Sequence, residues 1–212
     1  EQADYPKALD YYFKALKMDE ELGNKYGIAI HLGNIGNVYN KQADYPKALD
    51  YYFKALKIDE ELGYKYGIAI DLSNIGIVYK EQADYPKALD YYFKALKIDE
   101  ELGNKNGIAS ILGNIGIVYH EQADYPKALD YYFKALRMAE ELGNKYVIAI
   151  NLGNIGDLYI KTKKYKEAEE YLKKSLALSD TLGVLEGVKV ANQRLSELYS
   201  QLPIPNYKLS LE

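Results

Sequence analysis

The chain has 212 residues, and its 27 Lys and Arg against 31 Asp and Glu give a formal net charge of −4, which argues against nucleic acid as a partner because that partner requires clustered basic side chains. Hydrophobic residues make up 48% of the chain and charged residues 27%, as in a soluble folded protein, and no apolar run approaches the roughly 18 residues of a membrane span. The lack of Cys excludes a disulfide framework and a thiolate metal site.

A stretch of forty residues, 29–68, recurs along the chain with few changes. Internal repetition at a period of this length indicates a solenoid built from one structural unit. We expect a single array over residues 1–202, followed by a flexible tail at 203–212, which Pro203 and Pro205 separate from the last helix. The array divides into a partial first repeat at 1–26, repeats at about 27–66, 67–106, 107–146 and 147–186, and a capping helix at about 185–202. Because residue 1 falls inside a repeat, we expect the chain to be part of a longer array.

Each full copy contains two predicted helices, which we name helix A and helix B. The first helix A is predicted from about Gly27 to Lys41 by apolar residues at helical spacing. Helix B begins after Asp44, because Asp suits an N-cap and Pro46 is tolerated only in a first turn, and it ends near Leu62, where Gly63 supplies a stop. Later copies place helix A at about 67–81, 107–121 and 147–161, and helix B at about 84–102, 124–142 and 164–182.

The wide apolar arc of helix B predicts contacts with its own helix A and with both adjacent repeats. Leu49 and Phe53 are expected to pack on the following repeat, because their equivalents in the last copy are Glu169 and Lys173. The acidic run 59–61 at the end of helix B is interpreted as a solvated face.

The pattern of large, small and aromatic residues in one copy resembles the tetratricopeptide repeat. The positions that carry the resemblance are Leu32, Ile35, Gly36, Tyr39, Tyr45, Ala48, Tyr52, Ala55 and Leu56. The period of 40 residues is similar to that of Pins-type adaptors, kinesin light chain and many bacterial regulators. The resemblance implies an all-α fold, a right-handed superhelix of antiparallel helical hairpins, with the A helices lining a concave groove that usually binds a peptide.

The copies differ mainly on one stripe of helix A, whereas the core of helix B is identical in four of them. A varied stripe on a constant frame is typical of a binding surface, although exposed positions can also drift without function. The varied residues assigned to peptide binding are Asn37, Ile77, Ile117, Asp157, Asn40, Lys80 and His120.

Asparagine recurs without change in this stripe, at Asn34, Asn74, Asn114 and Asn154. An amide both donates and accepts, so a row of amides can pair with a peptide backbone, and the resemblance implies that contact. The alternative is that each Asn bonds the next helix. Gly33, Ser73 and Gly113 precede these Asn and indicate a close approach, either by a ligand backbone or by the neighbouring helix A. Gly36 and its equivalents are expected to serve helix packing.

Enzyme functions find little support. His31 and His120 occupy different repeat positions with no acid or thiol at ligand spacing. We therefore interpret them as solvated side chains. The Gly-Asn-Ile-Gly strings lie inside helices and lack the turn and Lys of a phosphate loop. We therefore expect no catalytic residues, no metal and no cofactor.

The two ends of the array differ. The final helix presents one apolar face and one polar face, as a cap should. The first helix B instead carries four apolar residues without a preceding repeat to cover them, Tyr11, Ala15, Met18 and Leu22. This arc predicts self-association as a two-fold dimer of the first helices.

The sequence thus favours a non-enzymatic interaction module that binds a protein or peptide segment, with neither nucleic acid nor membrane as partner. The alternatives are an architectural or designed array that acts through self-association, and a regulatory segment of a larger signalling protein. We expect a cytoplasmic location, although a signal upstream of residue 1 is compatible with the sequence.

Overall fold

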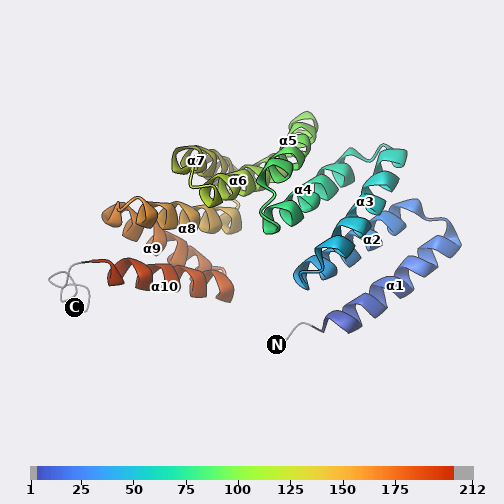
Figure 1. The fold of residues 1–212 in the computed structure, drawn as a ribbon, viewed down its shortest axis with the longest axis horizontal. Helices are drawn as coiled ribbons and strands as arrows, with labels where there is room; N and C mark the ends of the chain where they lie inside the picture. Colours follow the sequence, from blue (N-terminus) through green and yellow to red (C-terminus); the bar gives the residue numbers. More distant parts are fainter. Residues whose placement is uncertain (1–3, 203–212) are drawn as a thin grey trace. The chain divides into compact units, whose positions relative to one another are not determined.

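The computed structural model describes residues 4–202, and its regular elements in that range are ten α-helices (Figure 1). The all-α class and the repeated helical hairpins are therefore confirmed. The A helices are α2 Lys25–Lys41, α4 Lys65–Glu81, α6 Lys105–Glu121, α8 Lys145–Lys161 and α10 Leu185–Ser200; the B helices are α1 Tyr5–Leu22, α3 Tyr45–Leu62, α5 Tyr85–Leu102, α7 Tyr125–Leu142 and α9 Tyr165–Thr181. The predicted tail at 203–212 lies outside the described residues. No helix between residues 4 and 202 is long and apolar enough to cross a bilayer.

The helix ends follow the predicted capping residues. The Asp44 carboxylate accepts a hydrogen bond from the Lys47 backbone N–H at 3.3 Å, and Gly63 adopts a left-handed φ of 64°. The first helix A begins two residues earlier than predicted, because the Asn24 side chain caps it by accepting from the Gly27 N–H at 3.2 Å. The turn between helix A and helix B uses Ala43 at φ 57°, a left-handed position without glycine that the sequence did not indicate.

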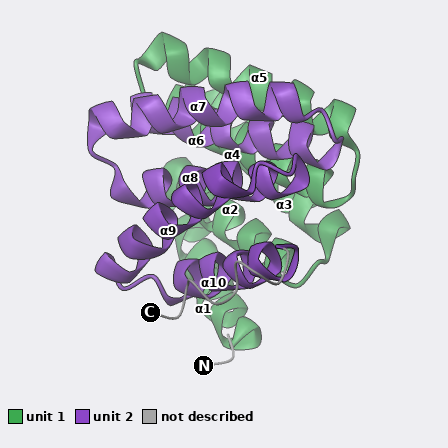
Figure 2. Ribbon diagram, turned by 90° about the vertical axis from the view of Figure 1, so that its left-hand side faces the viewer, with its two compact units in different colours: residues 1–104 green, residues 105–212 purple. Residues whose placement is uncertain are grey.

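The chain forms two compact units, residues 1–104 and residues 105–212 (Figure 2). The A helices α2, α4, α6 and α8 each pack most closely on the helix B that follows, whereas α10 packs most closely on α9, which precedes it. Consecutive A helices also approach each other directly, α2 with α4 in the first unit and α6 with α8 and α8 with α10 in the second, whereas no two B helices of one unit do so among residues 4–202. Within each unit the A helices are therefore the closer-packed layer. The single array over residues 1–202 stays a prediction.

In three of the hairpins, helix A and helix B are held together by an aromatic ring against a glycine. A Cβ on Gly36 would lie 2.7 Å from Cε1 of Tyr52, whose side chain is fully buried. The same contact recurs between Gly76 and Tyr92 and between Gly116 and Tyr132. The predicted packing role of these glycines is confirmed, since only a residue without a Cβ lets the ring lie this close to helix A.

Neighbouring repeats are joined by further ring contacts inside each unit. Phe13 meets Tyr51 edge-on in the first unit, and Phe133 meets Tyr171 in the second, each with 6.2 Å between ring centroids. In the last hairpin Glu169 instead accepts a hydrogen bond from the Tyr199 hydroxyl at 2.9 Å. Phe53, for which the packing was predicted, likewise meets Tyr91 of the following repeat edge-on with 6.2 Å between ring centroids, so the prediction is confirmed for Phe53.

The prediction of a solvated acidic run at 59–61 is wrong for its first member. Asp59 is buried, although Glu60 and Glu61 are exposed. The carboxylate of Asp59 occupies the space that a Cβ on Gly67 would need, at the N-terminal end of α4, where the helix dipole favours negative charge. Its position next to the following helix, rather than its own helix face, determines its burial.

A second buried carboxyl lies in the same unit at Asp71, which is 4% exposed and whose Oδ2 has no hydrogen-bond partner among the described residues. Burial, together with the nearby charge of Asp59, raises the pKa of Asp71 to about 8. Asp71 therefore holds a proton in the folded protein at pH values where the unfolded chain does not.

We predict opposite effects for two Gly→Ala substitutions only three residues apart. Gly36→Ala should lower the free energy of unfolding by about 1–3 kcal/mol, because the new methyl group overpacks against Tyr52. Gly33→Ala should raise it by about 0.5–1 kcal/mol, because the added Cβ meets only Asp71 Oδ1 at 3.7 Å and alanine favours the helix. Urea titrations of both variants measure the difference, and equal effects of the two substitutions would contradict the packing account.

We predict that stability falls as pH rises from about 4, the pKa of Asp in an unfolded chain, to about 8, the folded pKa of Asp71. In this window the folded state binds one more proton, so the free energy of unfolding decreases by up to about 1.4 kcal/mol per pH unit from this group. Asp71→Asn, which copies Asn151 at the equivalent position, should flatten this slope and be most stabilising above pH 8.

Denaturant titrations at four pH values measure this slope. Asp50→Asn, at an exposed residue paired with Lys54, is the matched control and should keep the slope of the wild type. An unchanged slope in Asp71→Asn would contradict the assignment.

Candidate functional site

The close approach of the A helices places their small residues against side chains of the next A helix. A Cβ on Gly33 would meet Asp71 Oδ1 at 3.7 Å, and a Cβ on Gly113 would meet Asn151 Oδ1 at 3.4 Å. Of the two explanations offered for these glycines, the structure therefore supports contact with the neighbouring helix A. In parts of the second unit, neighbouring helices do not cover the adjacent stripe of helix A that carries the repeated asparagines.

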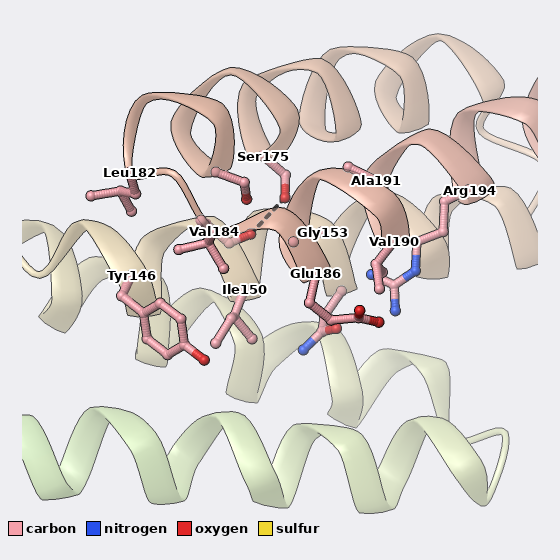
Figure 3. A pocket seen from close by; sticks show the side chains of 14 residues that line it. Tyr146, Ile150, Gly153, Ser175, Leu182, Val184, Glu186, Val190, Ala191 and Arg194 are labelled. Atoms are coloured by element: carbon pink, nitrogen blue, oxygen red, sulfur yellow. Dashed lines mark hydrogen bonds between the residues drawn. The ribbon is translucent and has the colours of Figure 1, made fainter. Parts of the chain in front are cut away.

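Three adjoining hollows lie along the A helices of the second unit. One of about 310 Å³ lies between α6 and α8, and a second of about 460 Å³ extends from Tyr132 and His120 to Arg194. The third, of about 200 Å³, is enclosed by α8, α9 and α10 (Figure 3). Asn154 lines all three hollows, which makes it the common point of the surface.

Six of the residues predicted to bind peptide line these hollows: Gly113, Asn114, Ile117, His120, Asn154 and Asp157. The remaining eight lie on α2 and α4 of the first unit: Gly33, Asn34, Asn37, Asn40, Ser73, Asn74, Ile77 and Lys80. All eight are half-buried except Asn37, which is exposed and accepts a hydrogen bond from the Tyr52 hydroxyl at 2.7 Å. The structure thus gathers the predicted residues of the second unit around one continuous surface.

Two amide atoms in the lining of these hollows lack a hydrogen-bond partner among the described residues, Asn151 Oδ1 and Asn154 Nδ2. The Nδ2 of Asn154 is a buried donor. Leaving a buried donor unpaired costs about 1–3 kcal/mol. Because this nitrogen is buried, an acceptor from outside the chain can reach it only after the Asn154 side chain turns toward the hollows.

A chain of polar contacts lies at one side of Asn154. His120 Nε2 is 3.5 Å from Asp157 Oδ2, and Asp157 Oδ1 is 3.8 Å from Arg194 Nε. Burial lowers the pKa of His120, against the opposing effect of the Asp157 carboxylate, so the ring is neutral at pH 7. The charged pair at this side of the site is therefore Asp157 with Arg194.

The interpretation of the two histidines as solvated side chains is wrong. The side chain of His120 is 18% exposed and that of His31 is 23% exposed, and His31 Nε2 lies 3.2 Å from Asp19 Oδ2. Both acids come from another helix, where sequence spacing cannot place them.

Two sets of residues were missed from the sequence, and among them Asn151 and Arg194 line the hollows. One is the repeat position of Asp71 and Asn151, which contact the glycines of the preceding helix A. Its signal was a change of residue type, His, Asp, Ile, Asn, at a position that is largely buried in every copy. The other is Arg194, which stands in α10 forty residues after Asn154 and lines two of the hollows.

The predicted self-association residues lie on α1. Tyr11, Met18 and Leu22 are 62%, 63% and 78% exposed, and Ala15 is half-buried. They form an apolar arc on the first helix of the chain, whereas the hollows are lined by residues of the second unit.

Comparison with solved structures finds the same fold in several proteins. BtubC (BKLC) from P. vanneervenii superposes with a TM-score of 0.71 at 17% identity over 94% of this chain and 92% of that protein. Aspartyl phosphate phosphatase F from Bacillus subtilis gives 0.76 at 21% identity over 85% of this chain and 46% of that one. A Rap protein complexed with Competence and Sporulation Factor gives 0.66 at 19% identity over 93% and 60%. This chain therefore spans about half the length of the last two, and the likeness concerns the fold.

No curated protein sequence matches the chain. A family model of the tetratricopeptide repeat, in contrast, matches four overlapping segments, residues 1–61, 27–101, 67–141 and 107–181. These segments contain each of the glycine–ring contacts and most of the A helices that line the hollows. The chain belongs to the tetratricopeptide repeat family.

Proposed function

We propose that the chain is a non-enzymatic protein-interaction module that binds a peptide segment along the A helices of the second unit. The observation that carries this proposal is the half-buried Asn154 side chain, which lines all three adjoining hollows and whose amide nitrogen has no partner among the described residues. An extended peptide presents a carbonyl acceptor at every residue, which is the group that this amide lacks. Membership of the tetratricopeptide repeat family supports a role in protein–protein interaction.

The constant residues of this surface would provide affinity for any peptide backbone, and the varied residues would provide selectivity for particular side chains. Asn114 and Asn154 are constant and would bind the peptide backbone, whereas Ile117, His120 and Asp157 change between copies and would contact its side chains. The complex of the structurally similar Rap protein with Competence and Sporulation Factor is consistent with a binding role for such an array.

The first test is peptide-library selection with the full chain, followed by affinity measurements on Asn114→Ala and Asn154→Ala. Each substitution should weaken binding of a selected peptide by about 1 kcal/mol or more, because one hydrogen bond to the peptide backbone is lost. The melting temperature should change little, since the Asn154 amide nitrogen has no partner within the described residues.

Asn192→Ala is the matched control, because Asn192 is exposed on α10 and lines none of the three hollows. It should bind the selected peptide as the wild type does. Unchanged affinity with a lowered melting temperature in the Asn154 variant would assign the asparagines to repeat stacking and refute the proposal.

A second candidate function is self-association through α1. The exposed Tyr11, Met18 and Leu22 form an apolar arc on one face of α1. In the next repeat of the same unit, the equivalent face is covered by the preceding helix B, where Phe13 contacts Tyr51. A two-fold contact between two such helices would cover both arcs at once.

Light scattering on the wild type and on Tyr11→Glu, Met18→Glu tests this candidate. The wild type should have the molar mass of a dimer at high concentration. The doubly charged variant should have the molar mass of a monomer, because burying two carboxylates without partners is unfavourable. A monomeric wild type, or a dimer unaffected by both charges, would exclude the arc as an interface.

A further inference from the structure

The hollow enclosed by α8, α9 and α10 has apolar walls. Ile150 from α8, Leu182 at the end of α9, and Val190 and Ala191 from α10 line it, as Figure 3 shows. The Ser175 hydroxyl donates its proton to the Ala149 carbonyl at 2.7 Å and so has no proton left to donate to a ligand. An occupant of this hollow therefore meets mainly hydrocarbon.

The hollow exists because a side chain present in other repeats is missing here. At the repeat position of Ala191, Asp71 extends toward Gly33 and Asn151 extends toward Gly113. Ala191 ends at its Cβ, so it cannot reach Gly153 in the same way. A Cβ on Gly153 would instead meet the tips of Arg194 and Ser175, each at 3.1 Å. The space between α8 and α10 is therefore left open.

The polar groups at this hollow limit the chemistry of the occupant. Glu186 and Arg194 contribute one negative and one positive charge, so the lining has no net charge that would select an ion. Arg194 is moreover 3.8 Å from Asp157, which compensates its charge. The other polar side chains of the lining are neutral, namely Tyr146, Ser175, Ser179 and Asn154. The Asn154 amide nitrogen has no partner in the described part of the chain.

We propose that this hollow is an anchor pocket that takes one uncharged, branched aliphatic side chain of a bound peptide, from Leu, Ile or Val. The backbone carbonyl next to that side chain accepts a hydrogen bond from Asn154 Nδ2, which the Asn154 side chain exposes by turning toward the hollow. The size is sufficient, because apolar cavities of about 150 Å³ already bind benzene, and this one measures about 200 Å³. The assignment rests on the proposed peptide-binding function and adds the class of residue that the peptide must carry.

The test uses N-acetylleucinamide, which presents one leucine side chain between two amide groups and requires no identified peptide. Titration into the full chain should shift the NMR signals of the Ala191 and Val190 methyl groups in a saturable manner. N-acetylalaninamide should bind at least about tenfold more weakly than N-acetylleucinamide, because its methyl group makes fewer hydrocarbon contacts with the pocket.

Ala191→Leu fills the hollow and should abolish the saturable response to N-acetylleucinamide at Val190. Ala177→Leu makes the same change at an exposed position of the adjacent helix α9 and should leave the response intact. Thermal unfolding of both variants shows whether they fold, and the comparison of the two amides on the wild type does not depend on either variant.

Absence of a saturable shift in the wild type, equal binding of the two amides, or full binding by folded Ala191→Leu would each overturn the anchor pocket. Failure of the proposed function looks different, because no library peptide would then depend on Asn154. A selected peptide that needs Asn154 but binds Ala191→Leu normally would retain the peptide groove and refute the pocket alone.

Discussion

The contact between a glycine of helix A and a buried side chain of the following helix B determines the geometry of each hairpin. Tyr52 lies where a Cβ on Gly36 would be, and the same pair recurs in the next two copies. In the last full hairpin Leu172 replaces the ring against Gly156, so the constraint depends on close approach rather than on aromaticity. Because this contact occupies one side of helix A, a different side remains for the neighbouring A helix and for ligands.

The contacts between A helices then determine where the surface is open. Asp71 and Asn151 reach back to a glycine of the preceding helix A, and each fills part of the space between the two helices. Ala191 does not, and a hollow results. One repeat position thus controls both the stability of the stack, through a buried carboxyl at Asp71, and the shape of the surface, through a missing side chain at Ala191.

The sequence allowed most of the fold to be predicted, because its signals are local. Asp44, Pro46 and Gly63 mark the ends of a helix by their own backbone and capping preferences, and repetition multiplies the signal. The left-handed turn at Ala43 could not be predicted, since alanine has no preference for that conformation.

The candidate site was predictable only in part. The stripe that contains Asn114, Ile117 and Asn154 could be identified by comparing copies, and the structure places these residues around adjoining hollows. The burial of His31 and Asp59 and the role of Ala191 could not be inferred, because each depends on how two helices from successive repeats approach each other. A helical projection of one helix contains no information on that approach.

The central claim is that the A helices of the second unit bind peptide through their constant asparagines. The most direct measurement is an NMR titration of the full chain with a library-selected peptide, with the side-chain NH₂ signals of asparagine assigned. The account predicts that the signals of Asn114 and Asn154 shift together and saturate at one peptide per chain, while that of Asn192 stays unchanged. Saturable binding that leaves the Asn154 signal in place would contradict it.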